Sequence, residues 1–211
     1  MILKTLDSAS GRRQFLLNVL PAGTLLCLGG GHLLAITNGQ DKPKPAEKKH
    51  KFLEDSGMSM QEVFEFAYKD YYIPLLRSLA PYFKNGDFIE ILKRAADDQA
   101  AKSGQAEAKT LSKNDFATFK AMITKPPEGF EKQVLTVSTV EVTDRAIESK
   151  VTECLWAKTF RKANASDIGY ARICYPDFAS ARAYSPKLKL IRTKTLMQGD
   201  DCCNHRWVWE G

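Results

Sequence analysis

The pattern of hydrophobic and polar positions predicts three helices in the first half of the folded chain. Two of them begin with a capping box, Ser59 with Glu62 and Asp87 with Glu90, after which apolar residues recur at helical spacing. Ser112 precedes a third run of this kind and is expected to cap it. The first half of the domain is therefore expected to be helical.

Prolines and small residues mark the expected ends of these helices. Pro74 should kink or end the first helix, because proline lacks the backbone N–H and clashes with the preceding turn. Residues 100–109 are polar, rich in alanine and contain Gly104, so we expect a connection there. Pro126 and Pro127 end the third helix.

After these prolines the hydrophobic period becomes that of strands. Residues 133–143 and 146–152 are separated by Asp144 and Arg145 and predict a β-hairpin. The other elements predicted here are a helix over 155–164 and strands over 188–195 and 203–209. This order indicates an α+β fold, in which N-terminal helices pack on a small, mostly antiparallel sheet with short inserted helices.

Residues 1–35 have the features of an export signal. Arg12 and Arg13 precede an apolar stretch, Leu17–Leu28, that is too short for a spanning helix of about 20 residues. No stable membrane span is expected unless this signal stays uncleaved. The paired arginines indicate the twin-arginine translocase as a partner and a periplasmic or otherwise extracytoplasmic bacterial protein. A Sec signal with a chance arginine pair is the alternative.

Composition and charge limit the class of protein. The chain is 44% hydrophobic and 27% charged, which is typical of a globular protein. Residues 36–55 are expected to form a flexible Lys/Pro linker, and residues 56–211 are expected to be a single domain. The formal net charge is +6, but much of the excess lies in this linker without interleaved aromatic residues. Nucleic acid is therefore not an expected partner.

Four cysteines follow the signal, and no two of them form a C-x-x-C pair. They are Cys154, Cys174, Cys202 and Cys203. Three of them, Cys154, Cys174 and Cys203, lie at predicted ends of elements, where functional residues are often placed. These three can serve as ligands of a divalent metal such as zinc. In an oxidising compartment the four cysteines can instead form two disulfides.

The last predicted strand brings together the other candidate groups. Cys203 and His205 lie on one face of that strand and Arg206 on the other. Cys203 and His205 can therefore act as nucleophile and base, or as two metal ligands. Packing of His205 beside Trp207 and Trp209 is the alternative.

Three ordered stretches resemble a known family. They are Thr152-Glu153-Cys154-Leu155-Trp156-Ala157, Asp167-Ile168-Gly169-Tyr170-Ala171 continuing to Cys174 and Asp177, and Arg192-Thr193-Lys194-Thr195-Leu196-Met197-Gln198-Gly199 with Cys203 and Arg206. Together they are similar to the L-2-amino-thiazoline-4-carboxylic acid hydrolase family. The resemblance implies opening of a cyclic thiazoline to N-carbamoyl-L-cysteine. The chain departs from the family pattern at Asn204, where the family usually has aspartate.

The resemblance, together with the strand pattern, predicts roles for individual residues. Cys203 or Cys174 is the expected nucleophile, and Asp177 is expected to orient or deprotonate, with His205 as the local base. Arg206 is expected to bind the substrate carboxylate, and Gly199 is assigned to the substrate site. The resulting hypothesis is an exported hydrolase that opens a small cyclic acid containing nitrogen and sulfur. The alternative is a non-enzymatic periplasmic binding or redox-accessory protein with disulfide-paired cysteines.

Overall fold

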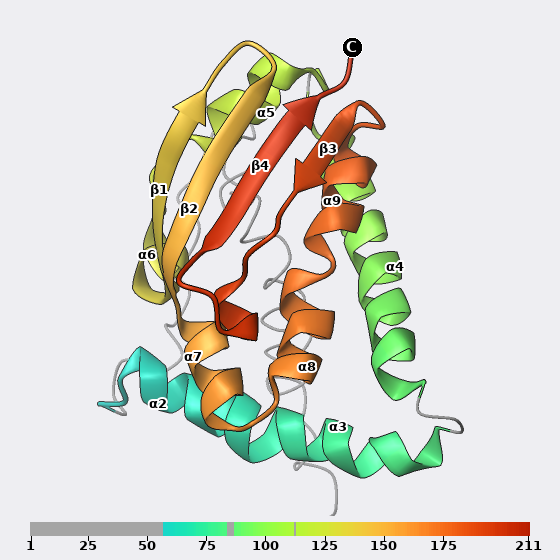
Figure 1. The fold of residues 1–211 in the computed structure, drawn as a ribbon, viewed down its shortest axis with the longest axis vertical. Helices are drawn as coiled ribbons and strands as arrows, with labels where there is room; N and C mark the ends of the chain where they lie inside the picture. The colour runs from blue at the N-terminus through green and yellow to red at the C-terminus, as the bar shows by residue number, and fades with distance from the viewer. Residues whose placement is uncertain (1–56, 84–86, 112) are drawn as a thin grey trace, which may run out of the picture.

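The computed structural model describes residues 57–83, 87–111 and 113–211 (Figure 1). The predicted signal and linker lie outside these ranges. The described residues form a four-stranded sheet with helices, so the predicted α+β class is confirmed. None of the helices in these ranges is both long and apolar enough to span a bilayer.

The sheet is antiparallel throughout, with strand order β1-β2-β4-β3. Its strands are β1 (Leu135–Val142), β2 (Ala146–Cys154), β3 (Leu188–Ile191) and β4 (Cys203–Trp209). The predicted hairpin is confirmed by the pairing of β1 with β2. Residues 133 and 134, predicted as strand, belong to the short helix α6 (Gly129–Val134) that precedes β1. β3 ends at Ile191 rather than at residue 195.

The first helix runs across one end of the sheet and does not end at Pro74 (Figure 1). It consists of α2 (Met60–Phe64), the π-helical segment η2 (Glu65–Tyr72) and α3 (Ile73–Leu79), followed by the 3₁₀ turn η3 (Ala80–Tyr82). The N–H of Ile73 bonds to the carbonyl of Tyr68, five residues earlier. Pro74 lies at the start of α3, directly after the π-helical segment. Its missing N–H therefore falls where the backbone hydrogen bonds change from the π-helical to the α-helical pattern.

The connection predicted at residues 100–109 is wrong, because helix α4 (Phe88–Ala108) continues through it. Gly104 lies where α4 packs on α9 (Asp177–Tyr184). A Cβ at this position would be 2.9 Å from the Cβ of Ala183. The glycine thus permits a close approach of two helices. Helix α5 (Phe116–Ile123) is capped by Asp115, whose side chain accepts the N–H of Thr118. Ser112, the predicted cap, lies outside the described residues.

The helices cover one face of the sheet and leave the other face to solvent. Residues of β2 and β4 alternate in burial, with Ile147 and Trp207 buried and Lys150 exposed. The remaining short helices are α7 (Leu155–Lys162), α8 (Ser166–Gly169), η5 (Tyr170–Cys174) and η6 (Leu196–Gln198).

Two hydrophobic clusters form the core. One surrounds Trp156, whose indole N–H donates to the hydroxyl of Tyr68 at 3.1 Å. The other joins α5, α9 and the sheet around Trp207.

The close approach at Gly104 predicts a large effect of a bulky residue there. Gly104→Val should lower the free energy of unfolding by about 1–3 kcal/mol, because its side chain must push α4 from α9. Ala106→Val, at an exposed position of the same helix, should cost less than about 1 kcal/mol. Urea denaturation of both variants checks this prediction, and equal effects at the two positions would contradict it.

Candidate functional site

Strand β4 places its side chains as the sequence predicts. Cys203, His205 and Trp207 lie on the buried face of the sheet, and Arg206 lies on the opposite face. There Arg206 pairs with Glu141 and, at 3.0 Å, with Glu148. The structure therefore does not bring the predicted carboxylate-binding Arg206 to the same place as Cys203 and His205.

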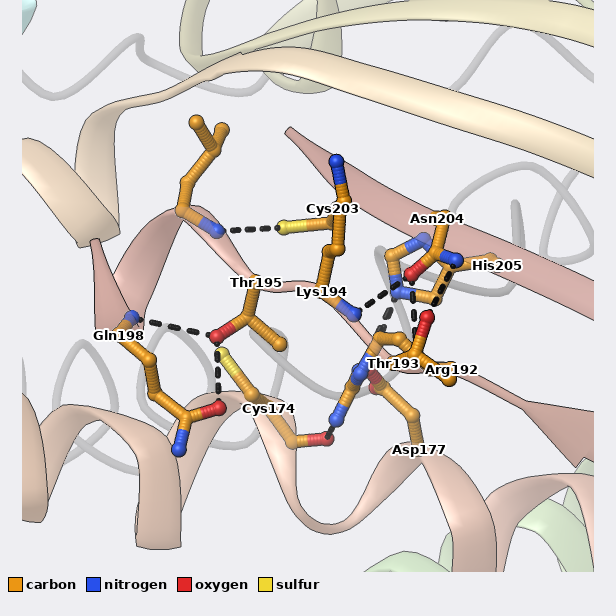
Figure 2. A network of polar contacts seen from close by, with 11 residues as sticks. Cys174, Asp177, Arg192, Thr193, Lys194, Thr195, Gln198, Cys203, Asn204 and His205 are labelled. Atoms are coloured by element: carbon orange, nitrogen blue, oxygen red, sulfur yellow. Dashed lines mark hydrogen bonds and ion pairs between the residues drawn. The ribbon is translucent and has the colours of Figure 1, made fainter. Parts of the chain in front are cut away.

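A different arginine lies at the centre of the buried face. Arg192, directly after β3, donates from Nη1 to Oδ2 of Asp177 at 2.5 Å and from Nη2 to the carbonyl of Cys174 at 2.8 Å (Figure 2). The side chains of Arg192 and Asp177 are each 2% exposed. Asp177 is the first residue of α9, but its side chain makes no cap for that helix and instead pairs with Arg192. A desolvated pair of this kind is stable only with both partners present.

His205 contacts the same guanidinium. Its Nε2 lies 3.2 Å from Nη1 of Arg192 and 3.6 Å from Oδ2 of Asp177 (Figure 2). Arginine can only donate, so this contact is a hydrogen bond when Nε2 of His205 carries no proton. The ring also stacks on Trp207, with centroids 5.5 Å apart. Nε2 of His205 is thus engaged with Arg192, and no hydrogen bond joins His205 to Cys203 in the described part of the chain.

The three thiols at the ends of elements share this region. The sulfur of Cys154 accepts the N–H of Ala157 at the start of α7, and that of Cys203 accepts the N–H of Leu196 at 3.2 Å. Burial raises the pKa of Cys154 to about 12 and raises the pKa values of Cys174 and Cys203. These thiols are therefore protonated near neutral pH.

Among the residues that the structure describes, the cysteines are not paired and do not form a cluster of metal ligands. Cys154, Cys174, Cys202 and Cys203 are all free thiols. Within residues 57–83, 87–111 and 113–211, no group of three or more His, Cys, Asp or Glu side chains is arranged to hold a metal ion. Cys154, Cys174 and Cys203 are thus not arranged as a set of metal ligands.

Asn204 and Gly199 shape the loop between β3 and β4. The side-chain oxygen of Asn204 accepts the N–H groups of Thr193 and Lys194, at 3.0 and 2.7 Å (Figure 2). An amide oxygen accepts these hydrogen bonds as a carboxylate oxygen would. The asparagine at position 204, where the family usually has aspartate, therefore still anchors the loop. Gly199 has a φ of +103° at the end of η6, and this conformation favours glycine. Its observed role is to turn the chain.

A surface pocket of about 560 Å³ opens where the β1–β2 hairpin meets α7. Cys154, which is half-buried, lines it together with the acidic Glu153 and with Leu196 from η6. Lys132, Gln133, Val134, Leu135, Thr136, Thr152, Leu155, Ala157, Lys158 and Arg161 complete the lining. Cys203 lies directly behind this wall, since its sulfur accepts the N–H of Leu196. Among the four cysteines that the structure describes, Cys154 is the one in the pocket lining.

Sequence reasoning missed Arg192 and the basic residues of the pocket. Arg192 lies within one of the stretches that resemble the family, but an arginine beyond an alternating strand gives no signal of burial. Lys158 and Arg161 lie three residues apart in the helix predicted over 155–164, so they share a face of that helix. This spacing predicts that the two cations lie together, but it does not predict that they face a pocket.

The fold and the site define a small α+β protein with a buried polar cluster behind a basic pocket. Residues 62–207 match the family model described as L-2-amino-thiazoline-4-carboxylic acid hydrolase, which is more than half of the chain. The chain therefore belongs to this family. No curated protein and no solved structure matches the chain.

The buried pair predicts a strong effect when one charge is removed. Arg192→Met leaves the carboxylate of Asp177 buried without its cation and should lower the free energy of unfolding by about 3–5 kcal/mol. Adding Asp177→Asn removes that charge, so the double variant should be less destabilised than the sum of the two single variants. Urea unfolding of the four proteins measures this coupling, and additive effects would show that the pair is not coupled.

Proposed function

We propose that this protein is an exported hydrolase that opens a small cyclic acid containing nitrogen and sulfur, and that the substrate binds in the pocket beside Cys154. The family match supports hydrolase-like chemistry. One observation carries the choice of site. Thr152, Glu153, Cys154, Leu155 and Ala157, from the first stretch that resembles the family, line this pocket together with Leu196 from the third. Two stretches distant in sequence thus meet at one cavity.

The reaction requires few groups from the protein. Water adds to the amidine carbon of the thiazoline, the bond from that carbon to the ring sulfur breaks, and protons pass to the ring nitrogen and the sulfur. The product then carries a urea group and a thiol. A general base must accept a proton from the attacking water. Glu153 is the acidic residue in the pocket lining, and its carboxylate accepts a hydrogen bond from Thr136. We assign the role of base to Glu153.

Water, rather than a cysteine, is the proposed nucleophile. A thiolate is the reactive form of cysteine, and the raised pKa values of Cys154, Cys174 and Cys203 keep these thiols protonated near neutral pH. His205 is not placed as a base for Cys203, because its Nε2 contacts Nη1 of Arg192 at 3.2 Å and, among the described residues, no hydrogen bond joins it to Cys203. In this proposal Asp177, Arg192 and His205 position the wall that contains Leu196, and the thiol of Cys154 forms part of the pocket surface.

Replacement of the proposed base tests the function. Glu153→Gln should lower kcat for 2-amino-thiazoline-4-carboxylate by about 10²–10⁴-fold, because an amide cannot accept the proton. Release of the product thiol measures turnover, with enzyme alone as the blank. Glu148→Gln, on the solvent face of the same strand, is the matched control and should retain kcat.

Three outcomes would contradict this proposal. Normal turnover by Glu153→Gln rejects the base, and loss of turnover in Cys203→Ser without loss of folding restores a cysteine nucleophile. Binding of thiazoline acids by the wild-type protein without any turnover would favour a non-enzymatic binding protein.

Export by the twin-arginine route is a separate part of the proposal and has its own test. Replacing both Arg12 and Arg13 with Lys should remove the protein from the periplasmic fraction and leave the precursor in the cytoplasm, because this translocase reads the arginine pair. Immunoblotting of cell fractions, with a Sec-exported protein as the control, measures the distribution. Unchanged export would indicate a Sec signal.

A further inference from the structure

The pocket beside Cys154 holds an excess of positive charge that the described part of the chain does not neutralise. Lys132, Lys158 and Arg161 line it, against the single carboxylate of Glu153, which leaves an excess of two positive charges. None of the three cations forms an ion pair with an acidic residue in the ranges that the structure describes. Lys158 donates to the side-chain oxygen of Gln61 at 2.7 Å, and Arg161 is 3.4 Å from the carbonyl of Leu196.

Neighbouring cations on the same surface behave differently. Lys162, one residue beyond Arg161 on α7, pairs with Glu65 at 2.7 Å. Arg77, on α3, pairs with Asp167 at 2.8 Å. Cations gathered without acidic partners repel one another, and an anionic ligand between them relieves that repulsion. The pocket cations therefore differ from these two neighbours in having no acidic partner among the described residues.

We infer that the natural substrate of this protein carries two anionic groups, and that Lys132 on one side of the pocket and Arg161 on the other each bind one of them. A thiazoline carboxylic acid has one carboxylate, which would neutralise one of the two excess charges. The volume of about 560 Å³ lies in the range of drug-sized ligands, about 300–1,000 Å³, and exceeds what a five-membered ring with one carboxyl group fills. Both charge and space therefore accommodate a further acidic substituent.

The positions of the cations suit a ligand with carboxylates at two ends. Lys132 comes from α6, ahead of β1, whereas Lys158 and Arg161 come from α7, after β2. Two separate segments thus supply positive charge to one cavity. We assign the substrate class as small cyclic dicarboxylic acids. The cyclic part of this assignment rests on the proposed hydrolase function, but the preference for two charges does not.

Binding of simple anions tests the inference without turnover. Isothermal titration of the full protein at fixed ionic strength with glutarate, butyrate and inorganic phosphate compares a dicarboxylate, a monocarboxylate and a phosphate. Glutarate should bind at least about 10-fold more tightly than butyrate, because it adds a second charge pair. Arg161→Gln and Lys132→Gln should each reduce this ratio to near one. Lys162→Gln, the matched control on α7, should leave it unchanged.

Each other outcome has a definite meaning. Equal binding of glutarate and butyrate, or a ratio that survives both Arg161→Gln and Lys132→Gln, overturns the inference. Tighter binding of phosphate than of glutarate overturns the dicarboxylate assignment and identifies a phosphate-bearing ligand. Failure to turn over both a thiazoline monocarboxylate and a thiazoline dicarboxylate, with the glutarate preference intact, rejects the hydrolase proposal alone. The three replaced residues are exposed, so their variants should fold, and circular dichroism checks this.

Discussion

The ion pair between Arg192 and Asp177 is the interaction on which the rest of the site depends. It joins the residue that follows β3 to the first residue of α9, and Arg192 also binds the last carbonyl of η5 and Nε2 of His205 on β4. The two hydrophobic clusters meet here, since Cys174 and Cys203 belong to one and Trp207 to the other. A buried charge needs its partner, so these four segments can take only arrangements that keep the pair together.

This constraint reaches the pocket through the chain that follows Arg192. Asn204 holds the backbone of Thr193 and Lys194, and Gly199 then turns the chain back toward β4. Between these points Leu196 donates its N–H to the sulfur of Cys203 and presents its side chain to the pocket. The pocket wall is therefore an outer layer of the polar cluster. A change at Arg192 should shift that wall even though Arg192 does not line the pocket.

The sequence predicted the features that depend on local period and missed those that depend on contact between distant segments. The alternation in β4 placed Cys203 and His205 inside and Arg206 outside, because strand geometry alone decides this. Gly104 suggested a connection, but its cause is the neighbouring helix α9, which no local pattern records. Pro74 suggested a helix end, yet packing of Tyr68 and its neighbours keeps the helix continuous and the hydrogen bonding adapts. The burial of Arg192 has the same origin, since only the tertiary fold supplies its partner.

The protonated thiols and the basic residues of the pocket are parts of one electrostatic arrangement. If Cys154 and Cys203 were thiolates, their negative charges would cancel the positive excess that Lys132, Lys158 and Arg161 provide. Burial raises the pKa values of both thiols, so Cys154 in the pocket lining and Cys203 behind Leu196 stay neutral. The charge of the cavity is then set by Lys132, Lys158, Arg161 and Glu153. A basic lining with neutral thiols attracts anions without repelling a ring that contains sulfur and nitrogen. The same burial that makes the cysteines poor nucleophiles thus makes the cavity a better site for an acidic substrate.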